Sequence, residues 1–77
     1  MNIDAMIEEA RELMAKGKGR LAADVLTTAA IECQDPVQAA RIHQLGLEGR
    51  ETAGFFSRRS WDEVIRVAEK HGATAVT

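Results

Sequence analysis

The chain of 77 residues lacks the features that mark secreted and membrane proteins. Its one cysteine, Cys33, cannot form a disulfide within the chain, which fits a reducing compartment. No run approaches the roughly 18 apolar residues that a membrane-spanning helix needs. The first residues include Asn2 and Asp4 in place of the basic stretch of a signal peptide. We therefore expect a cytoplasmic protein that does not enter a membrane.

The chain also lacks a strong excess of charge of one sign. Ten Lys and Arg residues stand against twelve Asp and Glu, a formal net charge of −2 at pH 7. No overall positive field therefore attracts nucleic acid or acidic lipids. Apolar residues make up 45% of the chain and charged residues 29%, which is typical of a folded domain and not of a disordered chain. We expect a single domain, residues 1–77, whose small core would gain stability from association.

Residues with the spacing of a catalytic or metal site are missing as well. Cys33 falls on the apolar face of a predicted helix, and no basic neighbour marks it as reactive. His43 and His71 are far apart, and neither stands at metal-ligand spacing from another ligand type. The glycines at 17 and 19 have no preceding strand and do not form a phosphate loop. We expect a protein that is not an enzyme and that binds no cofactor and no metal ion.

The first half of the sequence shows helical periodicity. Apolar residues recur at helical spacing from Ile3 to Lys16 and again from Arg20 to Gln34. Gly17, between the two segments, suits the left-handed position that ends a helix. On the second helix the predicted buried face includes Leu21 and Cys33. These two helices are expected to form an antiparallel hairpin.

The second half of the chain predicts another pair of helices. Asp35 and Pro36 form a strong helix start, and Gln38 stands where a capping box would place it. This helix runs toward Gly54. Ser60 is predicted to cap a fourth helix that ends at His71-Gly72, followed by a frayed tail at residues 73–77. The fold class is therefore all-α, with four antiparallel helices as two helical hairpins.

Several short segments resemble the tetratricopeptide repeat. Ala23 and Ala30 lie seven residues apart, as small residues do in the second helix of that repeat, and Pro36 resembles the proline that opens the next one. Leu45-Gly46 and Trp61-Asp62-Glu63-Val64-Ile65 resemble parts of a second repeat. The spacing of 41 residues between Ala23 and Val64 departs from the family period of about 34. The resemblance implies tetratricopeptide-like hairpins and a small non-enzymatic, adaptor-like module for protein–protein interaction.

Residues 38–59 carry a second resemblance, to the bacterial helix-turn-helix. The segment 40–47 resembles its first helix with a glycine at the turn, and Arg50-Glu51-Thr52 resembles the start of a recognition helix. Arg50, Arg58 and Arg59 would contact phosphates, and Glu48 and Glu51 would oppose them. This resemblance implies a small DNA-binding regulator, and it stays open as the alternative function.

The third predicted helix has two apolar arcs when plotted at about 100° per residue. The larger arc should face the core and holds Ala39, Ile42, Leu45, Gly46, Gly49, Ala53 and Phe56. The smaller arc has little left to cover it in a four-helix domain, and exposed apolar patches tend to mark interfaces. We therefore predict docking on another protein, or a homodimer, through Ala40, His43, Leu47, Arg50, Gly54 and Phe55. In the alternative interpretation this helix is central and buried on both sides.

Phe55 and Phe56 are adjacent, so on a helix their side chains would point about 100° apart. We expect one of them to enter the core while the other is more exposed. Two interpretations are open for the pair. Either the turn into the fourth helix buries both, or the pair is a docking anchor, since aromatic residues dominate the energetics of protein interfaces.

Overall fold

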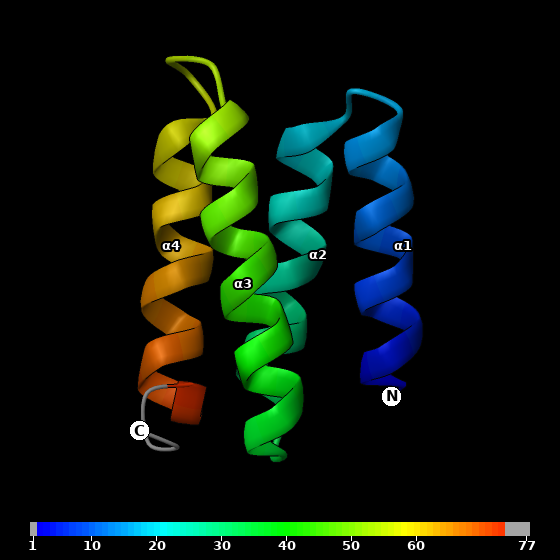
Figure 1. The fold of residues 1–77 in the computed structure, drawn as a ribbon, viewed down its shortest axis with the longest axis vertical. Helices are drawn as coiled ribbons and strands as arrows, with labels where there is room; N and C mark the ends of the chain where they lie inside the picture. Colours follow the sequence, from blue (N-terminus) through cyan, green and yellow to red (C-terminus); the bar gives the residue numbers. More distant parts are fainter. Residues whose placement is uncertain (1, 74–77) are drawn as a thin grey trace.

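The computed structural model describes residues 2–73 and consists of helices. They are α1 (Ile3–Ala15), α2 (Gly19–Glu32), α3 (Pro36–Thr52), α4 (Arg58–Ala68) and the π-helical turn η1 (Glu69–Ala73). Consecutive helices run antiparallel (Figure 1), and the described residues contain no strand. The predicted all-α fold of two helical hairpins is therefore confirmed. Of the predicted frayed tail, Ala73 ends η1, and the remaining residues lie outside the described part.

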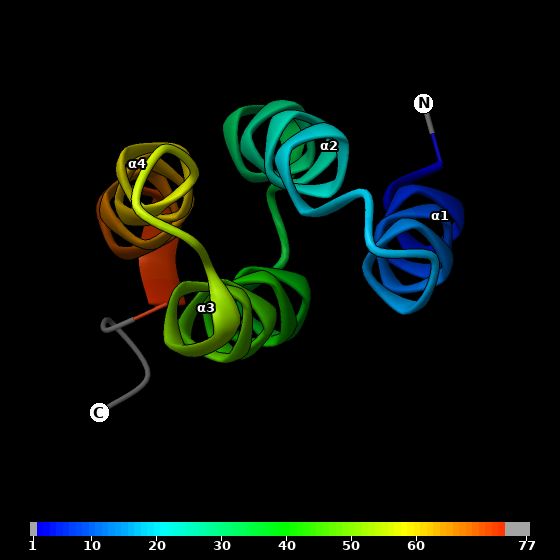
Figure 2. The same ribbon diagram turned by 90° about the horizontal axis from the view of Figure 1, so that it is seen from above.

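The two hairpins pack side by side through their second helices. α1 packs on α2, α3 packs on α4, and α2 also packs along α4. Seen from above, α2 and α3 lie at the centre while α1 and α4 flank them (Figure 2). None of the described helices is long and apolar enough to cross a membrane.

Side chains cap the two helices that begin at the lower end of the bundle in Figure 1. Asn2 Oδ1 accepts a hydrogen bond from the Ala5 amide at 3.1 Å, and Asp35 Oδ1 accepts one from Val37 at 2.9 Å. Asp35 is thus the N-cap of α3, as predicted. The prediction of a capping box at Gln38 is wrong, because the side-chain amide of Gln38 donates a hydrogen bond to Asp4 Oδ1 of α1 at 3.2 Å. This hydrogen bond links α1 to α3.

The fourth helix begins earlier than the sequence predicted. Its N-cap is Ser57, and Ser60 lies inside the helix, so the predicted cap at Ser60 is wrong. The amides of Ser57 and Arg58 both donate to the Gly54 carbonyl, at 3.1 and 3.2 Å. These bonds form a turn ahead of Ser60, and the helix continues from that turn.

Small residues on α2 let the other helices approach closely around a few large side chains. The largest fully buried side chains are Trp61, Leu26, Ile42 and Val64. Alanines fill much of the remaining core, namely Ala10, Ala22, Ala23, Ala29, Ala30, Ala39 and Ala68. Cys33 is buried, as predicted. The predicted burial of Leu21 is wrong, since 53% of it is exposed at the edge of the face that α2 presents to its neighbours.

α3 is continuous through both of its internal glycines. A Cβ on Gly49 would lie 2.4 Å from ring carbons of Trp61, and one on Gly46 would lie 3.1 Å from side-chain carbons of Val64 and Ile65. The glycines therefore let α4 pack directly against the backbone of α3. The turn that the helix-turn-helix resemblance places at Gly46 is absent, so that division of residues 38–59 into two helices is wrong.

Candidate functional site at the loop end of the bundle

Two exposed phenylalanines stand on the connection between α3 and α4. Phe55 is 90% exposed and Phe56 is 91% exposed, and their rings meet edge to face with centroids 5.3 Å apart. The predictions that one of the two enters the core, and that Phe56 belongs to the core arc of α3, are therefore wrong. The physical reason is that α3 ends at Thr52, so a helical plot no longer places the residues that follow. The interpretation in which the turn buries both rings is also wrong.

The connection that carries the phenylalanines lies at the same end of the bundle as the connection between α1 and α2 (Figure 1). We call this part of the molecule, residues 16–20 and 52–59, the loop end. Its two segments hold five of the ten Lys and Arg residues and none of the twelve Asp and Glu. The rest of the chain therefore carries five cations against twelve carboxylates. The loop end is the positively charged end of an acidic protein.

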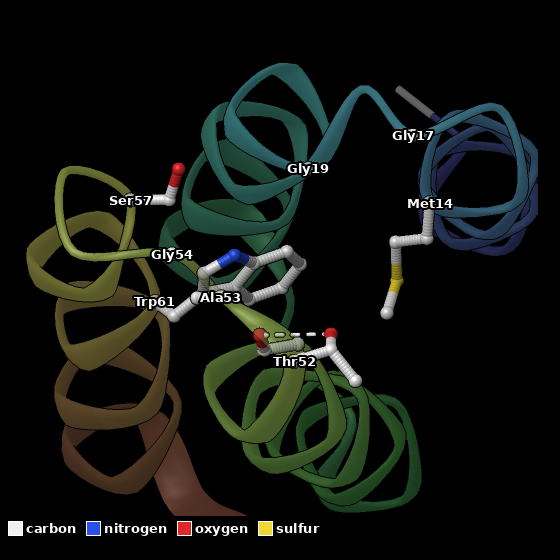
Figure 3. Close-up of a pocket in the computed structure, with 9 residues that line it drawn as sticks. Met14, Gly17, Gly19, Thr52, Ala53, Gly54, Ser57 and Trp61 are labelled. Atoms are coloured by element: carbon white, nitrogen blue, oxygen red, sulfur yellow. Dashed lines mark hydrogen bonds between the residues drawn. The ribbon is translucent and has the colours of Figure 1, made fainter.

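Between the two connections lies a hollow of about 330 Å³. It is lined by Met14, Gly17, Gly19, Gly49, Thr52, Ala53, Gly54, Ser57 and Trp61, as Figure 3 shows. The Trp61 ring forms one side of the hollow, although only 2% of this residue is exposed. Thr52 Oγ1 donates to the Gly49 carbonyl at 3.3 Å. Three glycines of the lining, Gly17, Gly19 and Gly54, leave the backbone at the two connections without side chains.

The residues predicted for an interaction surface on α3 separate into three places. Gly54 and Phe55 lie at the loop end. Ala40 and Leu47 lie exposed on the outer face of α3, with Leu47 43% exposed, so the alternative in which α3 is buried on both sides is wrong.

His43 and Arg50, the other two predicted residues, bond to the segments that follow α3 in the same hairpin. His43 Nε2 lies 3.1 Å from Glu69 Oε2, and Arg50 Nε donates to Asp62 Oδ1 of α4. These two side chains fasten α3 to α4 and η1, and the structure thus gives them a role in holding the hairpin together.

A shallower depression follows the opposite side of α3, next to α1. It encloses about 210 Å³ and is lined by Ile7, Glu8, Arg11, Arg41, Gln44, Leu45 and Glu48. Two arginines and two glutamates share this lining, so it has no dominant charge. This depression could not be predicted from the sequence, because its two walls come from α1 and α3, which belong to different hairpins.

Chemically reactive groups are few in the described residues. Burial raises the pKa of the Cys33 thiol, and the nearby Asp35 carboxylate raises it further, so the thiolate is scarce at neutral pH. Within residues 2–71, no three His, Cys, Asp or Glu side chains lie close enough together to hold a metal ion. The loop end combines exposed aromatic rings, glycine-rich backbone and cations.

No family model, curated protein sequence or solved structure matches this chain. The candidate site is accordingly interpreted from its own geometry.

Proposed function

We propose that this protein is a small, non-enzymatic protein–protein interaction module that docks a partner through Phe55 and Phe56 at the loop end. The observation that carries the proposal is the exposure of two adjacent aromatic side chains at 90% and 91%. Single exposed apolar residues are common on protein surfaces. Two rings in edge-to-face contact on one turn form a contiguous apolar patch, which is typical of an interface.

The size of the patch supports this role. A buried phenylalanine removes at least about 150 Å² from water, so the pair supplies about 300 Å² or more. A standard protein interface buries roughly 800 Å² on each partner. The two rings would therefore form the apolar centre of such an interface, with the cations of the loop end as its rim.

The charge of the loop end favours an acidic partner protein over a second copy of the chain at this surface. Two copies that met through their loop ends would bring five cations of one against five cations of the other. Like charges placed across an interface oppose association. The predicted homodimer would therefore use the outer face of α3, where Leu47 and Ala40 are exposed.

The arrangement of the helices supports the tetratricopeptide-like interpretation as part of this proposal. Two antiparallel hairpins pack in series, with alanines at positions 23 and 30 in the contact between them. Repeat arrays usually need about three repeats to be stable alone. Docking in the cytoplasm would supply the apolar contacts that two hairpins lack.

The proposal is tested by replacing both rings and measuring partner binding. The double variant Phe55→Ser, Phe56→Ser keeps every core residue, and Ile31→Ser is the matched control because Ile31 is exposed on α2, away from the loop end. Proteins captured by the wild-type chain are purified and titrated calorimetrically against the three chains. We expect wild type and control to bind alike and the double variant to bind at least about tenfold more weakly. A captured partner that binds the double variant equally well would contradict the proposal.

A further inference from the structure

The indole N–H of Trp61 donates no hydrogen bond to another described residue, and although the residue is 98% buried this N–H is not enclosed. The ring forms a side of the hollow at the loop end, with the nitrogen facing the space beside Gly19 (Figure 3). Every fully enclosed polar side-chain atom in residues 2–71 has a hydrogen-bond partner. The indole nitrogen has no partner among these residues, so it is not fully enclosed. The N–H therefore reaches the open space of the hollow. A donor that faces a hollow is suited to an acceptor brought by a ligand.

Two helices begin at the loop end. The first amide of α4, that of Arg58, donates to the Gly54 carbonyl, whereas the first amide of α2, that of Gly19, makes no such bond among the described residues. α2 starts at Gly19 and α4 starts at Arg58, and neither N-cap residue makes a side-chain capping bond. Neither helix has an acidic residue in its first turn. The first backbone bond within α2 runs from the Ala22 amide to the Lys18 carbonyl, so three preceding amides of α2 lie ahead of it. Free amides at a helix start point outward along the axis and bind anions.

The contrast with the other helices shows that this is a property of the loop end. α1 and α3 begin at the opposite end, and Asn2 and Asp35 cap them. The carboxyl ends of α1 and α3 lie at the loop end and offset part of the helix dipoles there. Five cations, at positions 16, 18, 20, 58 and 59, belong to the two segments of the loop end and flank the hollow without lining it.

We propose that the hollow is a binding site for the dianionic phosphate of a phosphate monoester. One oxygen accepts the Trp61 N–H, and the others face the first amides of α2 and the flanking lysines and arginines. A phosphate offers three acceptor oxygens and up to two negative charges at neutral pH, which suits this set of donors better than a singly charged carboxylate. The site goes beyond the proposed docking function, since it holds the phosphate group whether that group is free or attached to a protein.

The single tryptophan makes the site directly observable. The chain has one Trp, so its ¹H–¹⁵N spectrum contains one indole signal. We expect inorganic phosphate at pH 8 to shift this signal and the Gly19 amide along saturable curves that share one dissociation constant. Sodium chloride of matched ionic strength is the control, because salt alone screens charges without occupying the hollow. Shifts that are linear, or that chloride reproduces, would overturn the proposal.

Substitutions distinguish binding of phosphate in the hollow from a general attraction of phosphate to surface charge. A Cβ on Gly19 would lie 3.7 Å from Trp61 Nε1, an ordinary contact distance. Gly19→Ala therefore leaves the fold intact and fills the space in front of the N–H, and we expect it to abolish the saturable indole shift. Lys18→Gln with Arg58→Gln should weaken binding by about tenfold, whereas Lys70→Gln in η1 should leave it unchanged. Equal binding by Gly19→Ala and wild type would overturn the proposal.

Two further titrations identify the source of the phosphate and keep the two proposals distinct. Free O-phosphoserine and a phosphoserine peptide with a phenylalanine beside it are compared on wild type and on the Phe55→Ser, Phe56→Ser variant. Tighter binding of the peptide that the double variant loses, with unchanged binding of inorganic phosphate, assigns the site to a phosphorylated protein segment. Equal binding of both ligands by both chains supports a free phosphorylated metabolite, and docking through the phenylalanines is then decided by the calorimetric titration of captured partners alone.

Discussion

Gly49→Ala is the substitution that most directly tests how Trp61 packs against α3. The added Cβ would lie 2.4 Å from two carbons of the indole ring, a distance at which something must shift. The ring is buried between Gly19 of α2 and Gly49 of α3, so it can relieve this contact only by shifting toward the hollow at the loop end. Overpacking of this kind costs about 3 kcal/mol at the upper end of its usual range. Alanine regains about 1 kcal/mol of helix propensity over glycine, so we expect a net loss of about 2 kcal/mol.

Urea unfolding followed by circular dichroism measures this loss. For a small domain the free energy of unfolding falls by about 1 kcal/mol per molar urea, so the midpoint should fall by about 2 M. A loss of this size is a large part of the stability of a 77-residue domain.

Two other glycines provide matched controls. Gly46→Ala gains the same helix propensity, and its Cβ would meet aliphatic carbons of Val64 and Ile65 at the longer distance of 3.1 Å, so its effect should be intermediate. Gly54→Ala meets nothing within 4 Å and should leave the midpoint unchanged or slightly higher. If Gly49→Ala matched or exceeded wild type in stability, Trp61 would not lie against the backbone of α3, and the account of that interface would be refuted.

Three further predictions concern the outer face of α3, the buried thiol and nucleic acid. Because Leu47 is 43% exposed, Leu47→Glu should keep the helical spectrum, and it should convert any dimer formed through this face to a monomer in light scattering; unfolding would show instead that Leu47 is buried. Burial raises the pKa of Cys33, so iodoacetamide should alkylate the native thiol on the order of 100-fold more slowly than the urea-unfolded one, and equal rates would contradict its enclosure. Duplex DNA should not be retarded below micromolar protein at low salt, whereas a band that is lost on Arg50→Ala and Arg58→Ala would support the DNA-binding alternative.

The sequence was sufficient to predict that the four helices form, because the patterns that indicate a helix are local. The apolar stripe of α1, the cap at Asp35 and the break at Gly17 each depend on residues within one or two turns of the chain. Periodicity also placed the core faces of α1 and α4, where Ile7, Val64 and their neighbours are buried. Such short-range patterns state which face must be covered and leave open which helix covers it.

At the loop end, the sequence singled out Phe55 as a candidate anchor. It missed the exposure of Phe56, since the helical plot extends α3 to Phe56, whereas α3 ends at Thr52, four residues earlier. It also missed the hollow, because Gly19 and Ser57 are far apart in the chain and meet only when both hairpins place their connections at one end. The absence of acidic residues from these two connections was the one signal available from the sequence.

Tertiary packing alone decided the role of the glycines in α3. By propensity, Gly46 and Gly49 weaken a helix, and locally they resemble a turn. The structure keeps α3 continuous because Trp61, Val64 and Ile65 occupy the space that two Cβ atoms would fill. Burial of a tryptophan against α3 outweighs about 2 kcal/mol of lost helix propensity for the two glycines. The sequence determined where most of the helical residues lie. Contacts between residues distant in the chain determined whether a glycine within a helix marks a turn or a packing surface.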